Sequence, residues 1–255
     1  MSRIDLNADL GESFGPWPMG TDEALMASIS SANIACGFHA GDPSVMRRTV
    51  ALAKANGVAV GAHPGFPDLV GFGRREMSAS PDEVTDMVLY QVAALAGVAA
   101  SQGVRLQHVK AHGALYNMAA RKRDLAEAIA RGTAAFDRSL ILFGLPGSEL
   151  LRAGERAGLR VAAEVFADRA YEPDGTLVSR ARPGSVIHDR NEVVARAVRM
   201  VRERAVTAID GTLVRLQADT ICLHGDTPGA ADLARQVRRG LEAEGITVAP
   251  LLTNL

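Results

Sequence analysis

Ionisable side chains occupy alternate positions in the opening segment of this chain, and they are of the types that carry out acid–base chemistry. Asp5, Asn7 and Asp9 alternate with aliphatic residues, and Glu12 follows a glycine. Because alternate residues of a β-strand share a face, these three polar groups would lie on one side of a strand. If both faces of that strand are buried, the interior holds charge, which must be paired, bind a metal or line a wet pocket.

The same alternation returns in later segments that resemble strands. Their polar positions are Asn33, His63, His108, Lys110, His112, Glu164 and His224. Carboxylates and imidazoles can exchange protons with a bound substrate, and a lysine beside them can stabilise a developing oxyanion. The pattern predicts general acid–base catalysis around a small molecule.

More polar groups follow the ends of these segments. Arg74 and Arg75 come after a run of glycines and could grip a carboxylate or a phosphate. Asp42 precedes Pro43, so we expect it to cap a helix rather than to catalyse. The other candidates at these segment ends are Glu12, His39, Tyr116, Asp168, Arg169 and Asp226.

Strand-like and helix-like patterns alternate from end to end, which predicts a parallel α/β sheet with right-handed crossovers. The expected strands are 3–10, 31–36, 58–63, 106–112, 139–143, 160–166 and 219–224, and 246–251 could form a short eighth. The expected helices are 21–29, 43–56, 81–102, 122–135, 148–157, 190–205 and 228–244. Proline follows a capping residue at Asp42, Ser80 and Thr227, and Ser80 with Glu83 has the spacing of a capping box.

Seven or eight such repeats in 255 residues favour one (β/α) barrel domain over residues 1–255, with a doubly wound open sheet as the runner-up. The polar face would then line the barrel interior. Two simpler explanations remain open: an antiparallel sheet with one solvated face, and a buried polar network that only fixes the fold. Asp9 would lie at the strand exit among the catalytic candidates. Asp5, near the strand start, is expected to be a structural partner of interior His or Lys groups.

Composition excludes several classes of function. A net charge of -1 and an aromatic content of 4% give no case for nucleic-acid binding. The longest apolar run, Val92 to Ala100, is shorter than a membrane span, and the first residues lack the apolar core of a signal peptide. We therefore expect a cytoplasmic protein. Cys36 and Cys222 fall on opposite strand faces, so we do not expect a disulfide.

Several familiar catalytic motifs are absent from the sequence. It has no P-loop for ATP and no Cys-x-x-Cys or His-Glu-x-x-His zinc signature. His and Asp ligands from separate strands could still bind a divalent metal.

The chain resembles the LamB/YcsF family in six stretches that occur in order between residue 4 and about residue 250. These are LNADLGESFG, SANIACGFHAGDP, GAHPGFPDLVGFGRR, VKAHGALYN, EVFADRAY and DTICLHGD. One departure is Ala111, where the family favours proline. The resemblance implies a seven-stranded irregular, TIM-like (β/α) barrel of the glycoside hydrolase/deacetylase type.

The resemblance also implies cleavage of 5-oxo-L-proline to L-glutamate, driven by ATP in a complex with 5-oxoprolinase subunits B and C. The missing P-loop agrees with partner subunits that use the ATP. For the ring opening we expect Asp9 as general base, Lys110 as electrostatic stabiliser, and His112 or Glu164 as proton donor. The expected substrate-binding residues are Asn7, Glu12, Asn33, His39, His63, Arg74, Arg75, Tyr116, Asp168, Arg169, His224 and Asp226.

Two alternatives belong to other functional classes. A metal-dependent deacetylase would use His39, His63 and an aspartate of the first strand as ligands. A non-catalytic regulatory protein of the same complex would need no ionisable interior. The oligomeric state is open, and a homo-oligomer is compatible with the sequence.

Overall fold

Seven parallel strands close into a barrel in the computed structural model, which describes residues 2–180, 182–223 and 229–252. Each strand pairs with the next in the chain, and the last pairs with both β6 and β1, which closes the ring. The expected barrel is confirmed. Its strands are β1 (Arg3–Leu10), β2 (Ser31–Ala35), β3 (Ala59–His63), β4 (Leu106–Val109), β5 (Ile141–Gly144), β6 (Arg160–Phe166) and β9 (Thr220–Leu223).

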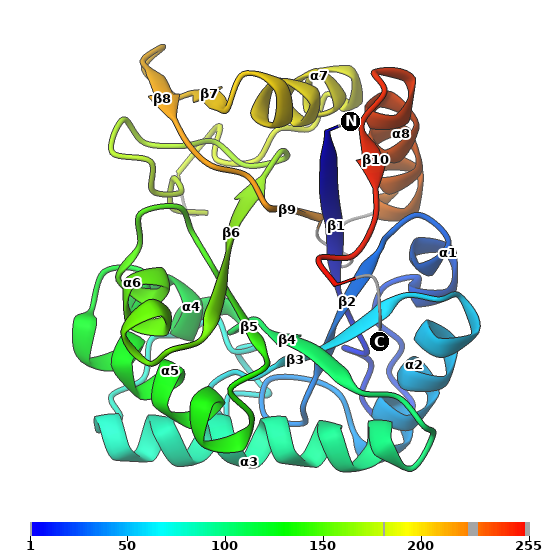
Figure 1. The fold of residues 1–255 in the computed structure, drawn as a ribbon, viewed down its shortest axis with the longest axis vertical. Coiled ribbons are helices and arrows are strands. Elements are labelled where there is room, and N and C mark those ends of the chain that lie inside the picture. The colour runs from blue at the N-terminus through cyan, green and yellow to red at the C-terminus, as the bar shows by residue number, and fades with distance from the viewer. Residues whose placement is uncertain (1, 181, 224–228, 253–255) are drawn as a thin grey trace.

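Helices surround the barrel (Figure 1). In the described residues they are α1 (Asp22–Met26), α2 (Pro43–Ala55), α3 (Pro81–Ala100), α4 (Gly113–Ala119), α5 (Arg123–Phe136), α6 (Glu149–Arg156), α7 (Arg190–Arg202) and α8 (Ala230–Ala243). The Asp42 carboxylate caps α2 by accepting from the backbone N–H groups of Ser44 and Val45. Ser80 and Glu83 form the expected capping box of α3. The expected cap at Thr227 lies outside the described residues.

Several elements differ from expectation. Helix α4 follows the fourth strand directly, and that strand ends at Val109 rather than at residue 112. A small antiparallel hairpin joins β7 (Ala205–Thr207) and β8 (Leu213–Arg215), and Asp210-Gly211 lies in its turn. That dipeptide is a common hairpin signal and was available in the sequence. The short strand expected near the end of the chain is β10 (Thr247–Val248), which pairs with the start of β1.

Among the described residues, helix α3 is long and apolar enough to cross a membrane by length and composition alone. The sequence predicts no such segment, because its uninterrupted apolar runs are shorter than a membrane span. Helix α3 has acidic residues in its first two turns, which interrupt the run, but is largely apolar beyond them. A core helix passes the same test, and α3 buries one side from Val84 through Val88 and Val92 to Ala99.

The barrel interior is polar, as the alternation of polar and aliphatic residues along the strands predicts. Asn33 donates from Nδ2 to Asn7 at 2.7 Å and to Asp9 at 2.8 Å, and it accepts from His108 Nε2 at 2.7 Å. Asn7 donates in turn to the Thr220 hydroxyl. This chain of hydrogen bonds links four strands and satisfies polar groups that are largely buried.

The partners of Asp5 correct one expectation. Within the described residues, the carboxylate accepts from the hydroxyls of Ser30, Ser31 and Thr220 and not from His or Lys groups. Burial raises the pKa of Asp5, and the three hydroxyl hydrogen bonds oppose that rise. The expected cysteine state is confirmed, since Cys36 and Cys222 are both free and buried.

Gly61 makes room for the ring of His108 inside the barrel. A Cβ atom at Gly61 would lie 2.1 Å from His108 Nε2. The ring cannot move aside, because it stacks on Phe143 with centroids 4.2 Å apart and is hydrogen bonded to Asn33.

We therefore predict that Gly61→Ala destabilises the protein by about 3 kcal/mol or more in urea unfolding, because the core has no space for the added methyl group. Gly97→Ala is the matched control: Gly97 lies on the exposed side of α3 with nothing within 4 Å of the new Cβ. It should be neutral or should stabilise by about 0.5–1 kcal/mol. Equal effects of the two substitutions would contradict this account of the interior.

Candidate active site

A cavity of about 510 Å³ opens beside the ends of β1, β3 and β6. Such a position at the carboxyl ends of barrel strands is where (β/α) barrel enzymes build their sites. The cavity is lined by eight of the residues expected from the sequence, namely Asp9, Glu12, His63, Arg74, Lys110, His112, Tyr116 and Arg169.

Lys110 lies at the buried side of the cavity between two carboxylates. Its Nζ is 2.7 Å from Asp9 Oδ1 and 3.1 Å from Glu164 Oε1, and it also donates to Cys222 Sγ at 3.0 Å. Burial alone would lower the pKa of Lys110, but the neighbouring acids outweigh it and raise that pKa well above its ordinary value. Lys110 is therefore a fixed ammonium ion aimed at the cavity, the kind of group that stabilises a developing negative charge.

The two oxygens of Asp9, which lines the cavity, have different partners. Its Oδ1 accepts from both Lys110 and Asn33, whereas its Oδ2 lies 3.3 Å from His63 Nε2. The hydrogen bonds to Oδ1 fix the orientation of the carboxylate. This arrangement suits a base that takes a proton through Oδ2.

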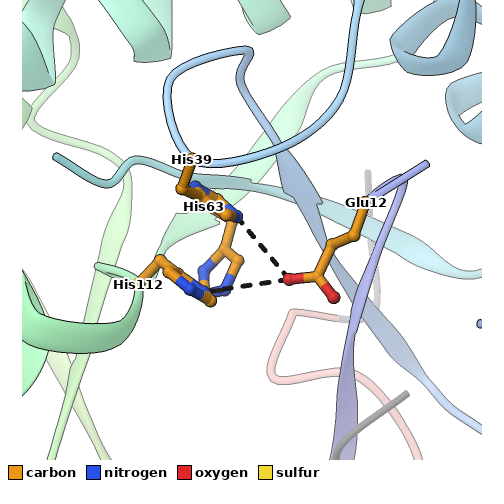
Figure 2. Close-up of side chains that lie close together, drawn as sticks. All are labelled: Glu12, His39, His63 and His112. Atoms are coloured by element: carbon orange, nitrogen blue, oxygen red, sulfur yellow. Dashed lines mark hydrogen bonds and ion pairs between the residues drawn. The ribbon is translucent and has the colours of Figure 1, made fainter. Parts of the chain in front are cut away.

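The imidazoles of His39, His63 and His112 and the carboxylate of Glu12 lie close together (Figure 2). His39 and His112 stack face to face, with ring centroids 3.8 Å apart and planes inclined by 3°. His63 Nε2 lies 2.9 Å from His112 Nδ1, and Glu12 Oε1 lies 3.6 Å from His39 Nε2. Each side chain presents one ligand atom, and these atoms lie within 4.8 Å of one another, so the group could hold a metal ion.

Burial favours the uncharged form of two of the imidazoles, those of His39 and His112. Burial lowers the pKa of His39 well below its ordinary value, and the neighbouring His112 and His63 lower it further. Burial and His63 have the same effect on the pKa of His112. At neutral pH the rings of His39 and His112 therefore act as lone-pair donors rather than as cations.

The cavity walls carry cations. Arg74 lies over the ring of Phe72, 4.9 Å from its centroid. Arg169 is buried and donates to the carbonyls of Ser185 and Val178, and burial with the nearby Arg180 lowers its pKa to about 10. Such walls suit an anionic substrate.

The structure places the other expected site residues away from the cavity lining. Asn7 and Asn33 lie below Asp9, while Glu164 and His39 are fully enclosed behind Lys110 and the imidazoles. Asp168 is also buried. Arg75 points to a separate surface hollow and is held by the Asp68 carboxylate. His224 and Asp226 lie outside the described residues.

Three further cations reach the cavity that the sequence had not suggested, namely Arg121, Lys122 and Arg180. Arg121 and Lys122 follow the unexpected helix α4, so its absence from the predicted elements hid their position. Arg180 lies in the long connection after β6, where no regular pattern gave its place.

Comparisons with known proteins agree with this fold. The family model described as "LamB/YcsF family" matches residues 4–255. A protein of Methylococcus capsulatus, named as the A subunit of 5-oxoprolinase, is 60% identical over 97% of this chain and 95% of its own length. One of Bacillus licheniformis with the same name is 55% identical over 99% of this chain and 100% of its own. That shared name implies a complex of several subunits.

Solved structures give the same picture. The "Lactam Utilization Protein" of Thermus thermophilus superposes with a TM-score of 0.93 at 52% identity, over 97% of this chain and 99% of that one. A structure titled "T48 deacetylase with substrate" matches with a TM-score of 0.51 at 14% identity, over 98% of this chain and 88% of that one, which shows a shared fold alone. Given the match of the family model and of relatives over nearly its whole length, this chain belongs to the LamB/YcsF family.

Proposed function

We propose that this chain opens the lactam ring of 5-oxo-L-proline to give L-glutamate, in a complex with subunits B and C that couples the reaction to ATP hydrolysis. The observation that carries the proposal is the Lys110 ammonium fixed between Asp9 and Glu164 beside a cavity with cationic walls. The relatives named after 5-oxoprolinase support the choice of substrate.

The chemistry needed is hydrolysis of an amide inside a ring. Water adds to the lactam carbonyl, the ring C–N bond breaks, and the nitrogen takes a proton. Lys110 would stabilise the negative charge that forms on the carbonyl oxygen. Asp9 would remove a proton from the water through Oδ2, and the resulting acid can return it to the leaving nitrogen.

The geometry narrows the choice of proton donor. Glu164 is fully enclosed beside Lys110, so its role is to hold the ammonium group in place. His112 gives its Nε2–H to the Phe72 carbonyl, which leaves no proton on the nitrogen that faces the cluster. Asp9 therefore serves best as both base and acid.

The use of ATP falls to the partner subunits in this proposal. The sequence has no P-loop, and the cavity is lined by the acid–base and cationic groups that hydrolysis requires. Coupling to ATP would place the complex in the cytoplasm. The substrate carboxylate would meet the cationic walls, where Arg74 and Arg169 are the candidate partners.

Reconstitution with subunits B and C, ATP and 5-oxo-L-proline tests the proposal by the release of glutamate. Asp9→Asn and Lys110→Ala should each lower turnover at least about 100-fold, because each removes a group that acts on the transition state. Asp22→Asn is the matched control, since that carboxylate binds the Gly11 backbone N–H outside the cavity. Full turnover by both cavity variants would remove these roles, and no glutamate from the native complex would contradict the function.

The neighbouring arginines provide a test of substrate binding. Arg74→Met should raise the KM for 5-oxo-L-proline roughly tenfold or more, because a charge-assisted contact to the carboxylate is lost, with little change in kcat. Arg75→Met should leave KM unchanged, because that side chain is paired with Asp68 outside the cavity. A larger KM effect at Arg75 than at Arg74 would contradict the assigned orientation of the substrate.

A further inference from the structure

Two histidines in the cluster have their protonation fixed by backbone carbonyls. His63 Nδ1 lies 2.7 Å from the Lys110 carbonyl oxygen, and His112 Nε2 lies 2.8 Å from the Phe72 carbonyl oxygen. A carbonyl oxygen only accepts hydrogen bonds, so each of these ring nitrogens must carry the proton. The other nitrogen of each ring, His63 Nε2 or His112 Nδ1, is then the one that can offer a lone pair to a bound ion.

Those two lone pairs point at the same place. His63 Nε2 and His112 Nδ1 are 2.9 Å apart, and each can act there as an acceptor; His63 Nε2 also lies 3.3 Å from Asp9 Oδ2. Two such acceptors repel unless a proton or a cation lies between or beside them. Metal-bound histidines commonly donate the second ring N–H to a backbone carbonyl, which is the arrangement of both rings here.

His39 completes the convergence. Neither of its ring nitrogens has a hydrogen-bond partner within the described residues, although the side chain is fully buried. Its Nε2 faces Glu12 Oε1 at 3.6 Å, and the same oxygen lies 3.8 Å from His112 Nδ1. A buried imidazole with no partner is costly unless its lone pair binds something.

The backbone around the cluster is shaped to hold these rings. Phe72, whose carbonyl orients His112, has a φ of 54°, a conformation that non-glycine residues rarely adopt. A Cβ atom at Gly65 would lie 2.8 Å from His39 Nδ1, and one at Gly73 would lie 2.8 Å from His112 Cδ2. Local strain and close glycine packing are typical of sites where side-chain position matters.

From these observations we infer that Glu12, His39, His63 and His112 bind one divalent metal ion of the zinc class. Zinc–nitrogen bonds of about 2.0–2.1 Å in a tetrahedral site place ligand atoms about 3.4 Å apart. The 2.9, 3.6 and 3.8 Å separations lie on either side of that value, and all four ligand atoms lie within 4.8 Å of one another. Rotation of these side chains, above all of the stacked His39 and His112 rings, would complete the shell. Three imidazoles favour zinc and its first-row neighbours over Mg²⁺ or Ca²⁺.

The site borders the cavity, since Glu12, His63 and His112 line it while His39 lies behind. When bound there, such an ion would polarise a carbonyl oxygen or acidify a water molecule. Metal binding itself stands apart from the proposed lactam chemistry, and only the catalytic use of the ion rests on that function.

Metal analysis of the isolated full-length chain tests the inference without any activity assay. After treatment with a chelator and titration with Zn²⁺, the native protein should bind about one ion per chain. Co²⁺ in its place should give the visible absorption of a low-coordinate nitrogen-ligated ion. His39→Gln and His112→Gln should each weaken Zn²⁺ binding at least about tenfold, whereas the exposed His188→Gln should not.

Circular dichroism and thermal unfolding of each variant confirm that it is folded before binding is compared. No stoichiometric Zn²⁺ or Co²⁺ in the folded native chain, or unchanged binding in both cluster variants, would overturn the inference. A proton shared between His63 and His112, seen by NMR in a native chain that binds no metal, would do the same. Failure of glutamate release in a chain that binds one Zn²⁺ per molecule would count against the proposed function and leave the metal site supported.

Discussion

The structure depends on keeping charge inside a closed barrel. An isolated ion in such an interior is strongly unfavourable, so Lys110 needs its two carboxylate partners and they need it. Asp9 is shared between this ion group and the amide of Asn33, which couples the charged layer to the uncharged layer beneath. The position of the reactive groups is thus set by the same contacts that make their burial tolerable.

Two kinds of chemistry meet at the cavity from opposite sides of Asp9. On one side is the Lys110 ammonium ion, and on the other are the imidazoles of His39 and His112, whose pKa values burial lowers. His63 joins them, because its Nε2 faces Asp9 while its Nδ1 binds the backbone carbonyl of Lys110. A change in the Lys110 ion group therefore affects the imidazole cluster, and the reverse, through these two contacts of His63.

The alternation of polar and aliphatic residues was enough to predict the polar interior, because a barrel strand has only two faces and its aliphatic face must pack against the helices. It could not predict which polar groups would pair. Asp5 bonds to hydroxyls because Thr220 lies opposite it on β9, and Ser30 and Ser31, where β2 begins, reach its other oxygen. Arg74 lines the cavity but Arg75 does not, because the Asp68 carboxylate in the same loop binds the Arg75 side chain. Helix α4 was missed because its glycine start resembles a strand end.

The central claim is that the Lys110 ammonium neutralises the Glu164 and Asp9 carboxylates inside the barrel. The test is to measure the free energy of unfolding in urea for the native chain, for Lys110→Met, for Glu164→Gln and for the double variant. Lys110→Met should cost about 3–5 kcal/mol, because it leaves buried carboxylates without a counter-charge. Glu164→Gln should destabilise the native chain but stabilise the Lys110→Met chain, where it removes one uncompensated charge. Glu164→Gln effects that agree within about 0.5 kcal/mol in the two backgrounds would contradict the claim.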